Sequence, residues 1–171
     1  MWNKRLRAIL WVGVIGASGL CTWADENEAS GSAVAKFMPT AKVTLQQALA
    51  TAASQGQPVS AKFEVDEGHF QLSVYTAQGG KFSEVLVDYN TGKVAKSEPI
   101  TGGDDLDEAK KQMEACAKSK KSLKSAVDQA EQGSGGYRAV SVTPKLSNGR
   151  PVAVVALLKG TRIKSVSEPL E

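Results

Sequence analysis

The amino-acid sequence predicts an α+β protein made of two similar halves, each with a helix packed on an antiparallel β-meander. Two observations lead to this prediction. The tripeptide Ser-Glu-Pro occurs at 97–99 and again at 167–169, each time after a similar order of residues. In both halves the spacing of the apolar residues also changes, from the helical period of about 3.6 residues to the strand period of two. We therefore expect two repeats of one unit.

Residues 1–24 predict a secretory signal peptide. Basic residues precede an uncharged, mostly apolar run at 8–20, and the segment ends with Ala24, after which we expect cleavage. The run is too short for a membrane span, which takes about 20 residues. A lipoprotein acylated at Cys21 is the alternative, which the bulky Leu20 disfavours. We expect a periplasmic or secreted protein that meets the membrane only through this cleaved segment.

Removal of that segment leaves a chain without net charge. Of the 21 basic residues, Lys4, Arg5 and Arg7 are lost, so 18 remain against 18 acidic residues, all of which lie beyond residue 24. Nucleic-acid binding depends on a surplus of Lys and Arg, so the total charge does not indicate a nucleic-acid partner. Cys116 is then the one remaining cysteine. No internal disulfide can form, and packing must stabilise the fold.

We expect the first repeat at 43–100 and the second at 122–171. Thr44 and Gln47 predict a capping box at the start of the first helix, and Ser122 predicts a cap at the start of the second. After each helix, apolar and polar residues alternate between turns, which is typical of half-buried strands. The expected strands are 59–65, 70–75 and 82–87 in the first repeat, and 138–143, 151–158 and 161–166 in the second.

A separate linker helix is expected at 101–121. Acidic residues lie at its start and lysines at its end, which matches the helix dipole. Before the first repeat, residues 25–42 are small and polar apart from Phe37 and Met38. This composition predicts a flexible leader.

The first repeat resembles the PepSY family. The segment TLQQALATA at 44–52 is similar to the opening helix of that family, and FSEVLVDYNTGKVAK at 82–96 is similar to its closing strand and turn. The second repeat is similar in its helix and strands but lacks the Asp-x-Asn-Thr-Gly turn, so it looks like a degenerate copy.

The resemblance implies a non-catalytic, extracytoplasmic module. PepSY units occur in the propeptides of thermolysin-like metalloproteases, where a role in restraining peptidases has been proposed. They also occur in bacterial membrane proteins of redox and iron-uptake systems. The motifs that carry the resemblance are structural, so they imply a fold more strongly than an activity.

His69 and Cys116 are the residues that could carry catalytic chemistry. With one histidine and one cysteine, neither a zinc site nor a nucleophile-and-base pair can be assembled. His69 adjoins a hairpin turn, where we expect it to be exposed. Cys116 lies on the apolar stripe of the linker helix, which predicts a buried thiol, and a redox thiol activated by nearby lysines is the alternative. We therefore expect no catalytic residues and no enzyme.

Asp88 and Asn90 begin the pattern of a calcium loop. That pattern requires a bidentate acid at its twelfth position, where this sequence has Pro99, although Glu98 is adjacent. A turn in which Asp88 and Asn90 bond their own backbone explains the same residues. Asp88, Asn90 and His69 are weak metal candidates only, and we expect no metal site and no cofactor.

Lysines gather around one end of the linker helix, at 110, 111, 118, 120, 121 and 124. A solvated helix end is the simpler interpretation of this cluster, and an acidic partner or an anionic lipid is the alternative. Few aromatic residues lie nearby to stack on bases, so the cluster does not predict nucleic-acid binding.

The segment 152–158 is apolar at every position. Strands of this kind lie where both faces of a sheet are covered. The linker helix could cover the second face; if it does not, the exposed patch marks a partner surface. The candidate contact residues are Val152, Val154, Val155 and Leu157, together with Val85 and Val87 of the strand at 82–87.

Together these patterns predict an exported binding protein that restrains or escorts another envelope protein, such as a peptidase. A client strand would pair with an open sheet edge, either 81–88 or 161–166. The alternative is an accessory or ligand-binding component of a membrane redox or iron-uptake system, with a metal held by His69 and the Asp88 turn. A homodimer is left open.

Overall fold

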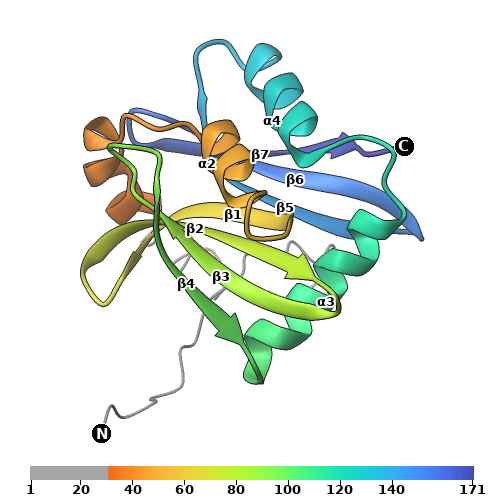
Figure 1. The fold of residues 1–171 in the computed structure, drawn as a ribbon. Coiled ribbons are helices and arrows are strands. Elements are labelled where there is room, and N and C mark those ends of the chain that lie inside the picture. Colours follow the sequence, from red (N-terminus) through yellow and green to blue (C-terminus); the bar gives the residue numbers. More distant parts are fainter. Residues whose placement is uncertain (1–30) are drawn as a thin grey trace, which may run out of the picture.

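A seven-stranded antiparallel sheet forms the centre of the computed structural model, which describes residues 31–171 (Figure 1). The order of the strands in the sheet is β4-β3-β2-β1-β5-β6-β7. The strands are β1 (Gln57–Asp66), β2 (His69–Gln78), β3 (Lys81–Val87), β4 (Val94–Ile100), β5 (Arg138–Ser147), β6 (Arg150–Lys159) and β7 (Arg162–Pro169). The helices are the 3₁₀ turn η1 (Met38–Thr40), α2 (Leu45–Ala52), α3 (Gly103–Ala117) and α4 (Leu123–Gln132). The α+β class predicted from the sequence is therefore confirmed.

A short antiparallel contact between β1 and β5 joins the two halves of the sheet. The paired residues are Ala61 with Val142 and Lys62 with Ser141. From this centre each half runs outward as a meander, so the first half ends at β4 and the second at β7. The two Ser-Glu-Pro segments consequently lie in the strands at opposite edges of the sheet.

The helices α2 and α4 lie side by side on one face of the sheet (Figure 1). The predicted capping box at the start of α2 is confirmed: Thr44 Oγ1 accepts the N–H of Gln47, and the Gln47 side chain accepts the N–H of Thr44. Ser122 caps α4 by accepting the N–H of Ser125. The Gln46 amide on α2 donates to Asp128 at 3.1 Å and to Glu131 at 2.7 Å, which ties the two helices together.

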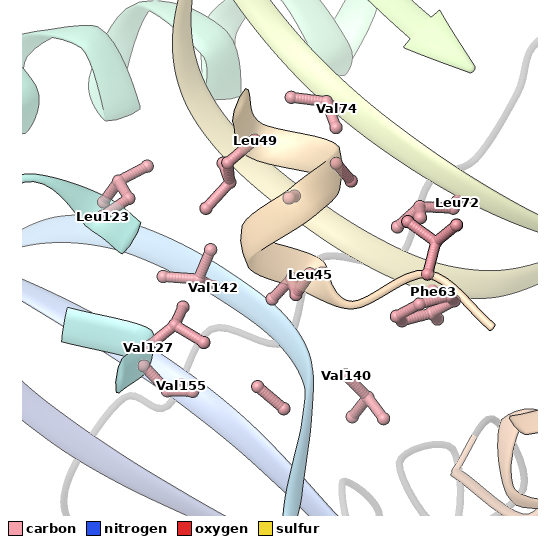
Figure 2. Packing of buried hydrophobic residues seen from close by; sticks show 14 of the residues in the cluster. Leu45, Leu49, Phe63, Leu72, Val74, Leu123, Val127, Val140, Val142 and Val155 are labelled. Atoms are coloured by element: carbon pink, nitrogen blue, oxygen red, sulfur yellow. The ribbon is translucent and has the colours of Figure 1, made fainter. Parts of the chain in front are cut away.

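The main hydrophobic core fills the space between these two helices and the sheet. Figure 2 shows Leu45 and Leu49 of α2 facing Leu123 and Val127 of α4, with Val142 of β5 between them. All five side chains are buried. This main core therefore contains residues of both halves of the chain.

The helix α3 packs on the opposite face of the sheet. Val74 belongs to the core beneath α2, whereas its neighbour Tyr75 packs in a second cluster with Ala109 of α3. Successive side chains on a strand point to opposite faces. The linker helix expected at 101–121 therefore covers the second face, and it contacts mainly β5 and β1.

The flexible leader expected at 25–42 is wrong for the part that the structure describes. Residues 31–37 are helical and continue into η1, and Val34, Met38 and Ala41 are buried in the main core. The Phe37 ring stacks on the Phe70 ring, with 5.6 Å between the centroids. The sequence did contain a signal for this docking, since Val34, Phe37, Met38 and Ala41 have the i, i+3, i+4, i+7 spacing of one helical face, and the prediction from composition overlooked it.

The strand β4 was not expected as a separate strand. No strand of the first repeat was predicted after residue 87, but the chain reverses there and Val94–Ile100 pairs along β3. The expected signal peptide at 1–24, with Cys21 and the cleavage after Ala24, lies outside the described residues. Within residues 31–171, no helix has the length and apolar character needed to cross a membrane.

Candidate functional site

The two edges of the sheet are β4 and β7, which corrects one of the two edges expected from the sequence. The strand at 81–88 is not an edge, because β3 pairs with β2 on one side and with β4 on the other. The other expected edge, 161–166, belongs to β7 and has a paired neighbour, β6, on one side only.

The backbone of β7 presents its free hydrogen-bonding groups at alternate residues. At the end of the strand, the Leu170 N–H points inward and donates to Pro151 O at 3.0 Å. Pro169 has no N–H, and its carbonyl oxygen accepts from Lys121 Nζ at 3.3 Å, on the outer side. Because the direction alternates along an antiparallel strand, Ser167, Ser165 and Ile163 also point their N–H and C=O groups outward. No strand among residues 31–171 pairs with these groups, so within the described chain the edge is a template of unpaired backbone groups.

The pairing of β7 with β6 is regular over its whole length. It runs from Lys159 with Arg162 to Val152 with Pro169 without a bulge. The β4 edge differs, since its register with β3 shifts between Leu86 and Val87. Bulges and prolines are features that protect an edge from pairing. The β7 edge, with its proline at the last position, is the more open of the two.

An apolar surface lies beside the β7 edge. Ile163 retains 43% of its exposure and is the exposed large hydrophobic residue among residues 31–171. On β6, the side chains of Val152, Val154 and Ala156 are half-buried, on the face where α3 lies. The helix α3 reaches β6 but packs mainly on β5 and β1, so it leaves these side chains partly open.

The other partner-contact candidates are in the core. Val155 and Leu157 are fully buried beneath α4, and Val85 and Val87 are buried beneath α2. They cannot contact a partner in the folded chain. The sequence could not separate the two faces of the apolar segment 152–158, because every position in it is apolar. Only Val152 and Val154 remain as surface candidates.

The weak metal candidates do not come together as a site. His69 is exposed at the β1–β2 hairpin, where it lies opposite Asp66 in the register of the two strands. The Asp88 carboxylate accepts the N–H groups of Asn90 and Thr91, both at 2.8 Å, and these bonds lower the pKa of Asp88. Among residues 31–171, no group of three or more His, Cys, Asp or Glu side chains is placed to hold a metal ion. Asp88 thus acts as a turn residue, as the simpler interpretation held.

Cys116 is half-buried at the end of α3, with Sγ 4.0 Å from the carbonyl oxygen of Val59. Burial raises the pKa of the Cys116 thiol to about 11. A thiol with a raised pKa is a poor nucleophile near neutral pH, because little of it is thiolate. The interpretation of Cys116 as a packing residue is favoured over a redox role.

A polar cluster beneath α3 was missed by sequence reasoning. The Ser73 hydroxyl lies 2.8 Å from the Glu64 carboxylate and 2.9 Å from that of Glu84, which is 6% exposed. The Tyr75 hydroxyl donates to Asp105 of α3 at 3.3 Å. Burial raises the pKa of Tyr75, and the charges of Glu84 and Asp105 add to this effect. These polar positions alternate with core residues, so they resembled a solvated face; nothing in the sequence says that α3 covers them.

Comparisons with known proteins give no family. No family model matches the sequence, and no curated protein matches it. A solved structure with limited similarity is that of a predicted lipoprotein from Clostridium difficile 630. It shares 13% sequence identity with a TM-score of 0.40, over 70% of this chain and 78% of that chain. Similarity at this level carries no argument about function, and the resemblance to the PepSY family stays a prediction.

Proposed function

We propose that this protein is an exported, non-catalytic binding protein that holds an extended segment of a client protein against the β7 edge. The observation that carries the proposal is the geometry of β7: an unbulged outer strand whose backbone groups at Ile163, Ser165 and Ser167 point away from the sheet. A client strand that pairs with such an edge gains affinity from main-chain hydrogen bonds.

The surface beside the edge supports the same proposal. Side chains of an added strand would alternate between the two faces of the extended sheet. On the α3 face they would meet the half-buried Val152 and Val154. Removal of apolar surface from water stabilises a complex by roughly 25 cal/mol per Å² of area. These side chains would give the edge a preference for apolar client residues.

We also propose that the two halves are copies of one PepSY-like unit. Each half begins with a capped helix and continues as an antiparallel meander, and each outer strand ends in Ser-Glu-Pro. The PepSY resemblance adds an envelope peptidase as the client to test first. Export rests on the signal-peptide pattern at 1–24, and it predicts a mature protein that begins at residue 25.

Binding rather than catalysis agrees with the side chains that are present. His69 is exposed in a hairpin, and Cys116 is packed against β1 at the end of α3. The two side chains belong to different elements, β2 and α3, so they do not form a nucleophile-and-base pair. Nothing in the structure favours the redox or iron-uptake alternative over this proposal.

Site-specific photocrosslinking in the producing cells tests the proposal. A photoreactive residue placed at Ser165 of β7 should give a discrete adduct with an envelope protein. The same residue at Ser97 of β4 is the control, because Ser97 is likewise an exposed serine in an outer strand of the sheet. Equal crosslinking from both edges, or none from Ser165, would contradict the proposal.

A proline variant then separates edge pairing from mere proximity. The N–H of Ser165 points outward and takes no part in pairing with β6, so Ser165→Pro should leave the fold intact and prevent a client strand from pairing. Ser97→Pro should fold equally well and keep the client. Retention of the crosslinked client by Ser165→Pro, with the photoreactive residue at Ser167, would contradict strand addition.

A further inference from the structure

A pocket of about 460 Å³ opens on the side of the molecule where α2, the end of α3 and the start of α4 meet. Pockets of roughly 300–1,000 Å³ are the size that small-molecule sites have in proteins. Its apolar lining includes Leu49 of α2, Pro58 of β1, Cys116 of α3 and Leu123 of α4. No residue of β7 lines the pocket, and the two sites meet only at Lys121, whose Nζ reaches the Pro169 carbonyl at the end of the client edge.

The charged side chains that line the pocket all have the same sign. They are Lys120, Lys121 and Lys124, and no Asp or Glu of residues 31–171 lines it. In a chain whose residues beyond 24 carry no net charge, this is a local concentration of positive charge. Such a concavity attracts anions, since walls of low dielectric strengthen the field inside it.

The structure divides the lysine cluster that the sequence shows. On α3, Lys110, Lys111 and Lys118 each pair with an acid one turn away. At the pocket, Lys124 pairs with Asp128 at 2.8 Å, but Lys121 bonds only the Pro169 carbonyl. The remaining lysine of the pocket, Lys120, is exposed and has no acidic partner among residues 31–171. A solvated helix end with balanced charges explains the lysines that pair along α3. It does not explain why Lys120 and Lys121 lie together at the pocket without an acidic partner in the described part of the chain.

Apart from the exposed amide of Gln57, the other polar groups at the pocket are already engaged. The Ser122 hydroxyl accepts the N–H of Ser125 at 3.1 Å, and the Ser119 hydroxyl donates to Ala115 O at 2.9 Å. The backbone N–H groups of Lys120 and Lys121 donate to Leu170 O. Recognition of an anion therefore falls to the lysine ammonium groups, and the remaining contacts are apolar.

We propose that this pocket binds a small aliphatic carboxylate, such as a medium-chain fatty acid. The carboxylate would lie between Lys120 and Lys121, and the aliphatic chain would pack against Leu49, Pro58 and Leu123. In the part of the chain that the structure describes, no aromatic residue lines the pocket, so these residues offer no surface on which a nucleotide base would stack. A single carboxylate on an apolar chain matches both the lysines and the apolar residues that line the pocket.

Calorimetric titration of the purified full-length protein with decanoate tests this site, below the concentration at which decanoate forms micelles. Decanol and decyltrimethylammonium are the comparison ligands, because they keep the chain and change the head group. Decanoate should bind saturably, and at least about tenfold more tightly than either comparison ligand, because only it gains the charge pairs. No saturable binding of decanoate, or binding of decanol with equal affinity, would overturn the proposal.

Two paired variants locate the site. Lys120→Gln with Lys121→Gln should weaken decanoate binding by about tenfold and leave decanol unchanged. Lys110→Gln with Lys111→Gln removes the same charge from outside the pocket and should bind decanoate as the wild type does. If the two double variants bind decanoate equally well, the proposal fails.

A pocket-filling variant and a thiol readout complete the test. Ala50 is exposed on α2 and lines the pocket, so Ala50→Trp should block both decanoate and decanol without disturbing the core. Alkylation of Cys116, followed on its own peptide by mass spectrometry, should slow when decanoate is added to the wild type. Unchanged alkylation at saturating decanoate would place the ligand elsewhere and overturn this assignment.

Discussion

At the scale of single residues, Arg138 connects the second half of the chain to the segment before α2. Its guanidinium donates to the carbonyl oxygens of Met38 at 3.4 Å, Ala41 at 3.0 Å and Val43 at 2.6 Å. It also lies 5.6 Å from the centroid of the Phe63 ring. Burial lowers the pKa of Arg138, which the nearby Glu131 carboxylate opposes. One side chain thus satisfies three carbonyl groups of the segment that composition had suggested was flexible.

Arg138→Ala should lower the free energy of unfolding by about 2–4 kcal/mol, because three partly buried carbonyl groups lose a charged donor. Urea unfolding followed by circular dichroism measures the change. Arg150→Ala, at an exposed turn position, is the control and should change stability by less than about 0.5 kcal/mol. Equal effects of the two substitutions would contradict the anchoring role of Arg138.

The Cys116 thiol gives a pH-dependent prediction. Its pKa is raised by burial from 9.0 to about 11, so the folded chain favours the neutral thiol. The stability that the neutral thiol contributes is present below pH 9.0 and is lost as the pH rises through about 11. The alkylation rate of Cys116 should therefore keep rising to about pH 11 in the folded protein. A rate that levels off near pH 9.0 would show an unperturbed, exposed thiol instead.

At the scale of elements, α3 docks on the sheet with an imperfect interface. Ala109, Gln112 and Ala115 face the sheet and are buried, but neither polar atom of the Gln112 amide has a hydrogen-bond partner among residues 31–171. A buried polar group without a protein partner costs about 1–3 kcal/mol. The helix is therefore held by its other contacts with the sheet, namely the apolar packing around Ala109 and the hydrogen bond from Tyr75 to Asp105.

Gln112→Met should stabilise the protein by about 1 kcal/mol, because methionine keeps the shape and helix propensity of glutamine and removes the buried amide. Gln129→Met on the exposed side of α4 is the control and should have almost no effect. Thermal unfolding of both variants gives the comparison. A lower midpoint for Gln112→Met would mean that the amide has a partner, and that α3 docks more firmly than described.

The elements also show what the sequence could and could not predict. The capped helices α2 and α4 and most strands follow from local periodicity, so they were predicted close to their observed places. The strand β4 was missed because its polar, proline-containing sequence pairs with β3 only after the turn at Asp88 reverses the chain. The burial of the Val155 and Glu84 side chains could not be predicted either, because it depends on where α4 and α3 pack on the sheet.

At the scale of the whole molecule, the two halves form one structure. The β1–β5 contact makes one sheet of them, and Gln46 joins α2 to Asp128 and Glu131 of α4. The main core cluster contains residues of both halves. This arrangement leaves the two Ser-Glu-Pro strands as the outer edges, of which β7 is regular and β4 is bulged. The choice of β7 as the candidate site follows from this difference between the two edges, which can be seen only in the folded sheet.

Hydrogen–deuterium exchange of the backbone amides, with and without the captured client, tests the central proposal most directly. The amides of Ile163, Ser165 and Ser167 should exchange at least about tenfold more slowly when the client is bound, because each would then lie in a hydrogen-bonded ladder. The amide of Ser97 in β4 should be unaffected. Unchanged exchange at the three β7 amides with the client bound would contradict the account.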